Sequence, residues 1–101
     1  MRIIGIDPGT ATTGYGIIDV VDGDIVPVVY GVIKTKPKTE MARRLQIIYE
    51  DVTELVRGYE PDEAGIEELF FGRNVTTAIT VGQARGVILL ALQNANLPIG
   101  E

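Results

Sequence analysis

The sequence contains neither cysteine nor histidine. Disulfides, thiol nucleophiles and histidine general bases are therefore excluded, and so are the usual ligands of zinc. Any metal ion that the chain binds must be held by oxygen atoms, which favours Mg²⁺, with Mn²⁺ as its substitute. Carboxylates are thus the first side chains to examine for chemistry.

The sequence also lacks a long apolar run. No stretch reaches the roughly 20 apolar residues that cross a bilayer, and the first apolar run stops at Asp7-Pro8, too early for a signal peptide. We therefore expect a cytoplasmic protein without membrane association. The length of 101 residues and the hydrophobic content of 46% fit one compact domain over residues 1–101.

Basic residues are outnumbered, since 9 Lys and Arg face 14 Asp and Glu and the net charge is −5. Such a charge argues against a nucleic-acid partner unless the cations cluster. Lys34, Lys36 and Lys38 do cluster, at every second position, which places them on one face of a predicted strand. A charged edge strand that resists aggregation explains them nearly as well as a contact with phosphate does.

Apolar patterns predict three strands in the first third of the chain. They cover residues 2–7, 14–21 and 25–35, and Asp22-Gly23-Asp24 marks a tight turn between the last two. Helical spacing follows over residues 40–59, with Thr39 as the predicted N-cap. The first part of the chain is therefore expected to form an antiparallel meander followed by a helix.

The second half predicts a strand over residues 63–68, a helix over 75–94 capped by Asn74, and a last strand from about Leu97. A strand, a crossover helix and a strand form a right-handed parallel unit. The fold class is therefore α/β: a mixed sheet of three antiparallel strands extended by parallel strands, with helices packed against it.

The helix over 75–94 is apolar on most of its surface, and we expect it to be largely buried. Its small residues form a stripe that lets another element come close; they are Ala78, Gly82 and Gly86. The expected neighbour of this stripe is either the sheet or the same helix of a second protomer.

Two acids occur in matching contexts, because Gly5-Ile6-Asp7 and Gly65-Ile66-Glu67 both end a short apolar run. Side chains alternate across a strand, so each acid shares a face with the glycine two residues earlier. On neighbouring strands the two carboxylates would face one another across about 5 Å. Their repulsion is relieved by a divalent cation, and the glycines leave room for a bulky substrate. An acid that only forms a turn is the alternative for either residue alone; their repetition favours a metal site.

Phe70 and Phe71 directly follow this second motif. Adjacent aromatics before a helix are usually one core side chain and one partly exposed ring. We expect Phe71 to pack inward and Phe70 to be exposed, where it can stack on an unpaired base. A Phe70 buried in the core is the alternative.

Three segments resemble the RuvC-type Holliday-junction resolvases, whose fold is that of ribonuclease H. They are IIGIDPGTATTGYGII, IEELFFGRN and VGQARGVILLAL, and the resemblance runs in unbroken order from Met1 to Glu101. It implies a structure-specific endonuclease that resolves four-way DNA junctions in recombination and repair.

Position by position, the resemblance implies that Asp7 and Glu67 are two of four catalytic carboxylates that bind Mg²⁺, and that Phe70 inserts into opened base pairs of the junction. Two Mg²⁺ ions about 4 Å apart would activate a water and stabilise the leaving 3′-oxygen. The working unit would be a homodimer that makes two symmetric nicks, with the RuvA-RuvB branch-migration complex as a partner. The family's other acids lie in a C-terminal portion that this sequence lacks, so we expect the 101-residue chain alone to be inactive.

Two alternatives stay open on the sequence. The segment DPGTATTGYG also resembles the first phosphate loop of the actin, Hsp70 and sugar-kinase superfamily, in which an Asp binds Mg²⁺ and a Gly-Thr turn holds ATP. Those proteins need two such domains and a second phosphate motif, far more than 101 residues. The other alternative is a resolvase-like module that binds DNA without cutting it.

Overall fold

A computed structural model describes residues 1–67 and 75–101. Within these ranges the elements follow one another as β1 (Arg2–Asp7), β2 (Thr12–Val21), β3 (Asp24–Lys34), α1 (Met41–Tyr59), β4 (Glu63–Ile66), α2 (Val75–Asn94) and β5 (Ile99–Gly100). The predicted order of strands and helices is confirmed, and most ends differ from the predicted ones by no more than two residues.

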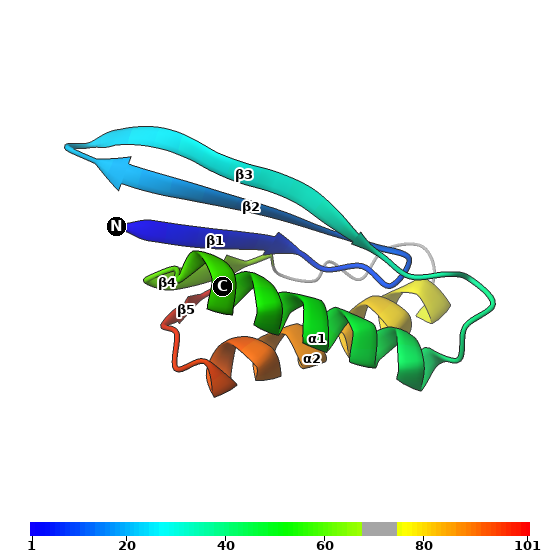
Figure 1. Ribbon diagram of the computed structural model, residues 1–101. Coiled ribbons are helices and arrows are strands. Elements are labelled where there is room, and N and C mark those ends of the chain that lie inside the picture. Colours follow the sequence, from blue (N-terminus) through cyan, green and yellow to red (C-terminus); the bar gives the residue numbers. More distant parts are fainter. Residues whose placement is uncertain (68–74) are drawn as a thin grey trace.

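The strands form one mixed sheet in the order β3-β2-β1-β4-β5 (Figure 1). β1 pairs antiparallel with β2, and β2 pairs antiparallel with β3. On its other side β1 pairs parallel with β4, which in turn pairs parallel with β5. β1 is therefore central, and α1 is the crossover that brings β4 beside it, as predicted.

The predicted tight turn joins β2 to β3 in a hairpin. Asp22 and Gly23 both have positive φ, at 52° and 82°. Two such residues form a turn whose twist matches the twist of the flanking strands. The hairpin also contains a register shift between Ile17 and Ile18, which the sequence pattern did not predict.

Both helices cover the same face of the sheet (Figure 1). The core lies between these layers and includes the largest fully buried apolar side chains, which are Ile4, Ile17, Ile48, Val52, Ile88 and Leu92. Burying each such side chain stabilises the fold by about 1.5 to 3 kcal/mol. No helix of the described ranges covers the opposite face, and that face carries Gly5 and Asp7.

A polar clamp closes the end of the sheet where β1 begins. The Arg2 guanidinium donates to both carboxylate oxygens of Asp19, at 2.8 and 3.0 Å, and to the Tyr59 carbonyl at 2.8 Å. The hydrogen bond from Arg2 lowers the pKa of Asp19 below its ordinary value, and the positive charge of Arg2 adds to this effect. The clamp ties β1 and β2 to the C-terminal end of α1.

Two local predictions were wrong. The N-cap of α1 is Glu40, without a side-chain capping bond, and not Thr39. β3 ends at Lys34, so Lys36 and Lys38 lie in the following turn and do not share a strand face with it. This happens because the Thr39 N–H donates to the Lys36 carbonyl and bends the chain after the strand.

The helix α2 is less buried than its composition predicts. Ile79 and Leu90 on this helix are 58% and 52% exposed. A Cβ placed on Gly86 would meet nothing within 4 Å. The small-residue stripe therefore does not pack against the sheet at Gly86. In the described ranges no helix is long and apolar enough to cross a membrane.

Candidate active site

The parallel pairing of β1 and β4 brings Asp7 and Glu67 together. Gly5 is paired with Gly65 and Ile6 with Ile66, and the Glu67 N–H donates to the Ile6 carbonyl at 3.2 Å. Ile6 and Ile66 are each only 4% exposed, since both point into the core. The residues one step further, Asp7 and Glu67, are exposed and lie side by side away from the helices. We call these two residues the acid pair.

The two carboxyl groups of the acid pair interact directly. The pKa of Glu67 is raised above its ordinary value, first by a side-chain hydrogen bond with Asp7, then by the negative charge of Asp7, and last by partial burial. In the described ranges neither carboxylate has an ion-pair partner among the arginines and lysines. The site therefore concentrates negative charge that the rest of the described chain does not neutralise.

Glycines form the surface beside the acid pair. Gly16, Gly5, Gly65 and Gly100 are paired in one row across β2, β1, β4 and β5. Gly14 is paired with Asp7, and a Cβ on Gly14 would lie 3.7 Å from the Asp7 Cβ. We call the row of four the glycine floor. It keeps side chains off the sheet next to the acid pair, as the sequence predicted for Gly5 and Gly65.

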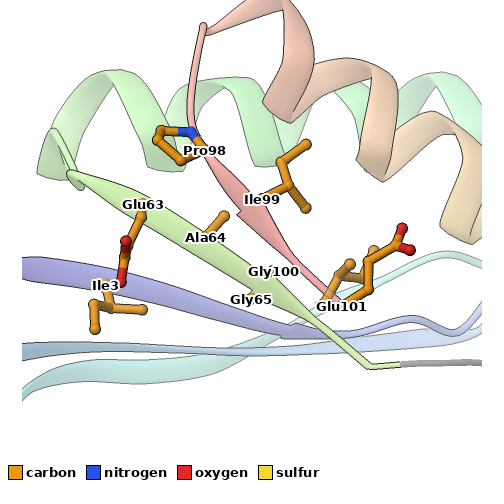
Figure 2. A pocket seen from close by; sticks show the side chains of 9 residues that line it. Ile3, Glu63, Ala64, Gly65, Pro98, Ile99, Gly100 and Glu101 are labelled. Carbon is orange, nitrogen blue, oxygen red and sulfur yellow. The ribbon is translucent and has the colours of Figure 1, made fainter.

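A hollow of about 600 Å³ continues the glycine floor along β4 and β5 (Figure 2). It is lined by Gly65 and Gly100 and carries two further acids, Glu63 and Glu101. In Figure 2 their carboxylates point to different sides of the strands. These two acids therefore do not form a second acid pair.

Arg85 on α2 holds the main chain at Glu67. Its Nε donates to the Glu67 carbonyl at 3.2 Å, and its Nη2 pairs with Glu101 Oε1 at 2.9 Å. The side chain is only 17% exposed. Sequence reasoning missed this role, although an arginine within the apolar segment VGQARGVILLAL was a usable indication.

The acid pair has the donors that a hard divalent cation prefers. Carboxylate oxygens are the usual protein ligands of Mg²⁺, and a cation between them would remove the repulsion that raises the pKa of Glu67. Among the described residues no group of three or more acidic side chains could hold a metal ion. The acid pair thus fits a metal, as part of a larger ligand set.

The aromatic pair and the three lysines were the other residues considered for contact with DNA. Phe70 and Phe71 lie outside the described residues. Lys34, Lys36 and Lys38 are all exposed, but only Lys34 is on a strand.

The comparisons with known proteins identify the family. The family model described as crossover junction endodeoxyribonuclease RuvC matches residues 3–101. This chain belongs to the RuvC family. The crossover junction endodeoxyribonuclease RuvC of Heliobacterium modesticaldum is 52% identical over 101 residues, which are 100% of this chain and 62% of the relative. The chain therefore spans about 60% of the length of the curated relatives that it matches.

Solved structures agree with this assignment. The RuvC of T. thermophilus in complex with a Holliday junction substrate matches with a TM-score of 0.89 and 31% identity, over 98% of this chain and 62% of that one. The yeast mitochondrial Holliday junction resolvase matches with a TM-score of 0.71 over 98% of this chain and 50% of that one, but at 10% identity it shows the fold alone. The fold is thus the ribonuclease H-like fold of the resolvases, and the family match disfavours the ATP-binding alternative.

Proposed function

We propose that this chain is part of a nuclease domain that resolves four-way DNA junctions by metal-dependent hydrolysis of phosphodiester bonds. The observation that carries the proposal is the acid pair. In a RuvC-family chain, two directly interacting carboxylates lie on the sheet face that no described helix covers, beside a floor without side chains. A phosphodiester backbone can approach such a surface closely.

Asp7 and Glu67 are proposed to be catalytic metal ligands. Both would hold Mg²⁺, or Mn²⁺ in its place, through their carboxylate oxygens. When bound, the metal lowers the pKa of a water and neutralises charge on the leaving oxygen. The protein's part is to keep both carboxylates at the ends of two rigid, hydrogen-bonded strands, with Arg85 fixing the main chain at Glu67. The glycine floor supplies the space for the substrate.

The unit that cuts both strands of a junction is proposed to be a homodimer. The exposed face of α2 supports this, because Ile79 and Leu90 are apolar, more than half exposed, and lie on either side of the open Gly86. The same helix of a second protomer would cover them. Of the two neighbours predicted for the small-residue stripe, we therefore propose the helix of a second protomer and not the sheet.

Two further assignments rest on the resemblance. Phe70 is proposed to insert into opened base pairs, and the RuvA-RuvB complex is proposed as a partner. Since chromosomal DNA of bacteria lies in the cytoplasm, the proposed location is cytoplasmic. Residues 1–101 are proposed to be one incomplete nuclease domain. A module that binds DNA without cutting it is the second candidate for the chain by itself, because its acid pair provides fewer than three acidic ligands in the described ranges.

The test uses a completed protein, which is this chain followed by the C-terminal region of the Heliobacterium modesticaldum relative. Asp7→Asn and Glu67→Gln should each abolish cleavage of a synthetic four-way junction in Mg²⁺, because the amides remove the attraction for metal. Both variants should bind the junction as well as the parent or better, because they also remove repulsion from phosphate. Asp22→Asn, which makes the same change at the distant hairpin turn, is the matched control and should cleave normally. Cleavage at the parental rate in either site variant would remove that residue from the proposed role.

A further inference from the structure

A second cleft lies on the helix side of the chain segment that follows Asp7. It has a volume of about 400 Å³ and is enclosed by residues 9–12 and by the first turns of α1 and α2. Among the described residues, one arginine, Arg44, and four threonines line it, and no acidic residue does. We call it the Arg44 cleft.

The Arg44 side chain is held in position through one of its nitrogens. Its Nε donates to Thr35 Oγ1 at 2.7 Å, and that hydroxyl donates to the Thr10 carbonyl at 2.6 Å. Thr35 is 7% exposed, so this link is shielded from water. Arg44 has no ion-pair partner in the described part of the chain, and its two terminal nitrogens have no hydrogen-bond partner there. A planar fork of donors is therefore left for a ligand.

The wall of the cleft opposite α1 is equally fixed. The Thr13 hydroxyl donates to the Gly9 carbonyl at 2.6 Å, and the Thr35 N–H donates to the Ala11 carbonyl at 3.0 Å. A Cβ on Gly9 would collide with the Thr12 carbonyl, so this tight conformation requires glycine. Thr10 Oγ1 is buried and has no hydrogen-bond partner among the described residues. This hydroxyl is therefore a further group whose hydrogen-bonding capacity is unused.

Guanidinium and hydroxyl groups in a preformed cleft without carboxylates are the chemistry that recognises a phosphate. Gly9, which lines the cleft, is two residues beyond Asp7, so the two Cα atoms lie at most about 7 Å apart, since a chain spans at most about 3.6 Å per residue. Successive phosphates of one strand rise by about 3.4 Å along a DNA helix. A strand that places one phosphate at the acid pair can therefore place another, a few nucleotides away, at Arg44.

We propose that the Arg44 cleft binds a backbone phosphate of the DNA strand that lies over Asp7 and Glu67. This proposal rests on the proposed function and adds a contact that positions the strand for cutting. Arg44 is its principal ligand, and Thr80 on α2 lines the opposite wall. The exposed Lys36 and Lys38 follow Thr35 in the chain.

The first test measures how the affinity of the completed protein for a synthetic four-way junction depends on salt, without divalent metal so that no strand is cut. Each phosphate contact contributes about 0.9 to the slope of log affinity against log salt. Arg44→Gln should reduce the magnitude of that slope by about 0.9. Between 50 and 200 mM salt, the affinity of the variant should therefore fall by a factor about 3.5-fold smaller than the affinity of the parent does. An unchanged slope in a folded Arg44→Gln protein would overturn the proposal.

Arg43→Gln is the matched control, because it removes the same charge from the preceding residue. Arg43 is exposed, contacts Gln46 and Glu50 on its own helix, and does not line the cleft. Its slope should equal that of the parent. A fall as large as that of Arg44→Gln would show that net charge, and not the cleft, governs binding.

A second variant covers the case that Arg44→Gln fails to fold for lack of the bond to Thr35. Thr80→Glu adds a negative charge to the cleft and leaves that bond in place, so it should weaken junction binding at least 5-fold at 100 mM salt, by about 1 kcal/mol. Gln93→Glu makes the same charge change at the exposed far end of α2 and should have no such effect. Equal affinities of these two variants would contradict the proposal.

The last arm separates a backbone phosphate from free phosphate. Inorganic phosphate should raise the thermal midpoint of the parent protein no more than sodium chloride of equal ionic strength does. Stabilisation by millimolar phosphate that Arg44→Gln abolishes, with an unchanged junction slope, would assign the cleft to a free phosphate and overturn the proposal. The proposed function is wrong if the protein does not bind the junction at all, or if variants without the acid pair still cut it. If the junction is bound and cut as expected but the salt slope of Arg44→Gln equals that of the parent, only the proposal for the Arg44 cleft is wrong.

Discussion

The glycine floor makes the sharpest prediction about how the sheet serves the site. Gly5 and Gly65 both have ordinary negative or extended φ, since Gly23 is the glycine with positive φ in the described ranges. A Cβ would lie 4.0 Å from the Gly16 carbonyl oxygen at Gly5, and 4.0 Å from the Gly100 carbonyl oxygen at Gly65. Both distances are ordinary van der Waals contacts, so the fold itself accepts alanine at either position.

Gly5→Ala and Gly65→Ala should therefore stabilise the 101-residue chain. The gain comes from the lower conformational entropy of the unfolded chain and amounts to about 0.4 to 1 kcal/mol. For a domain of this size it corresponds to a rise of about 2 to 8 °C in the thermal midpoint. Circular dichroism during heating and urea titration measure both quantities.

The same two substitutions should impair cleavage by the completed protein. The added methyl group occupies the floor beside the acid pair, and overpacking of a fitted surface costs about 1 to 3 kcal/mol, or roughly a 5- to 150-fold lower rate. Gly58→Ala on α1 is the control, because its Cβ would meet nothing within 4 Å and it lies away from the acids. It should stabilise the chain and leave cleavage unchanged.

Two results would refute this reasoning. A loss of more than about 1 kcal/mol of stability in Gly5→Ala or Gly65→Ala would mean that glycine is needed there for the backbone. Parental cleavage rates in both variants would mean that the substrate does not approach the glycine floor.

The remaining predictions concern the clamp, the core and the aromatic residue. Because Arg2 lowers the pKa of Asp19, the stabilisation that this carboxylate provides is present above its ordinary pKa and is lost as the pH falls. In urea titrations, Asp19→Asn should therefore destabilise the chain at pH 7 and match the parent near pH 2. An equal loss of stability at both pH values would contradict the clamp. Ile88→Ala should cost about 2 to 5 kcal/mol in the same titrations, whereas Leu90→Ala on the exposed face of α2 should change stability by about 0.5 kcal/mol or less; similar costs would contradict the orientation of α2. Phe70→Ala in the completed protein should weaken junction cleavage and cost less than the roughly 3 to 5 kcal/mol expected of a core phenylalanine; a loss of stability alone would return Phe70 to the core.

Local pattern was sufficient for most of the fold. Apolar alternation located β1 to β3, and Asp22-Gly23 located their tight turn, because both depend on neighbouring residues only. The crossover rule then placed β4 beside β1. Since side chains alternate along paired strands, this placement alone brought Asp7 beside Glu67, and the structure confirms that proximity.

The side-chain links that the sequence did not predict depend on contacts between distant segments. Arg44 is linked to Thr10 through Thr35, and Arg85 reaches the Glu67 carbonyl from α2. No periodicity marks such pairs. The exposure of α2 was missed for a related reason, because an apolar composition indicates that a surface is covered but not whether the same chain covers it.

The most direct test of the central claim is a Mg²⁺ titration of the 101-residue chain, followed through its backbone amide resonances by NMR. We expect the resonances of Asp7 and Glu67 to shift together, and we expect weak binding because the described acids provide only part of a ligand set. Asp7→Asn or Glu67→Gln alone should abolish the shifts. Shifts that centre on other acids, or that persist in both variants, would contradict the claim that these two carboxylates form one metal site.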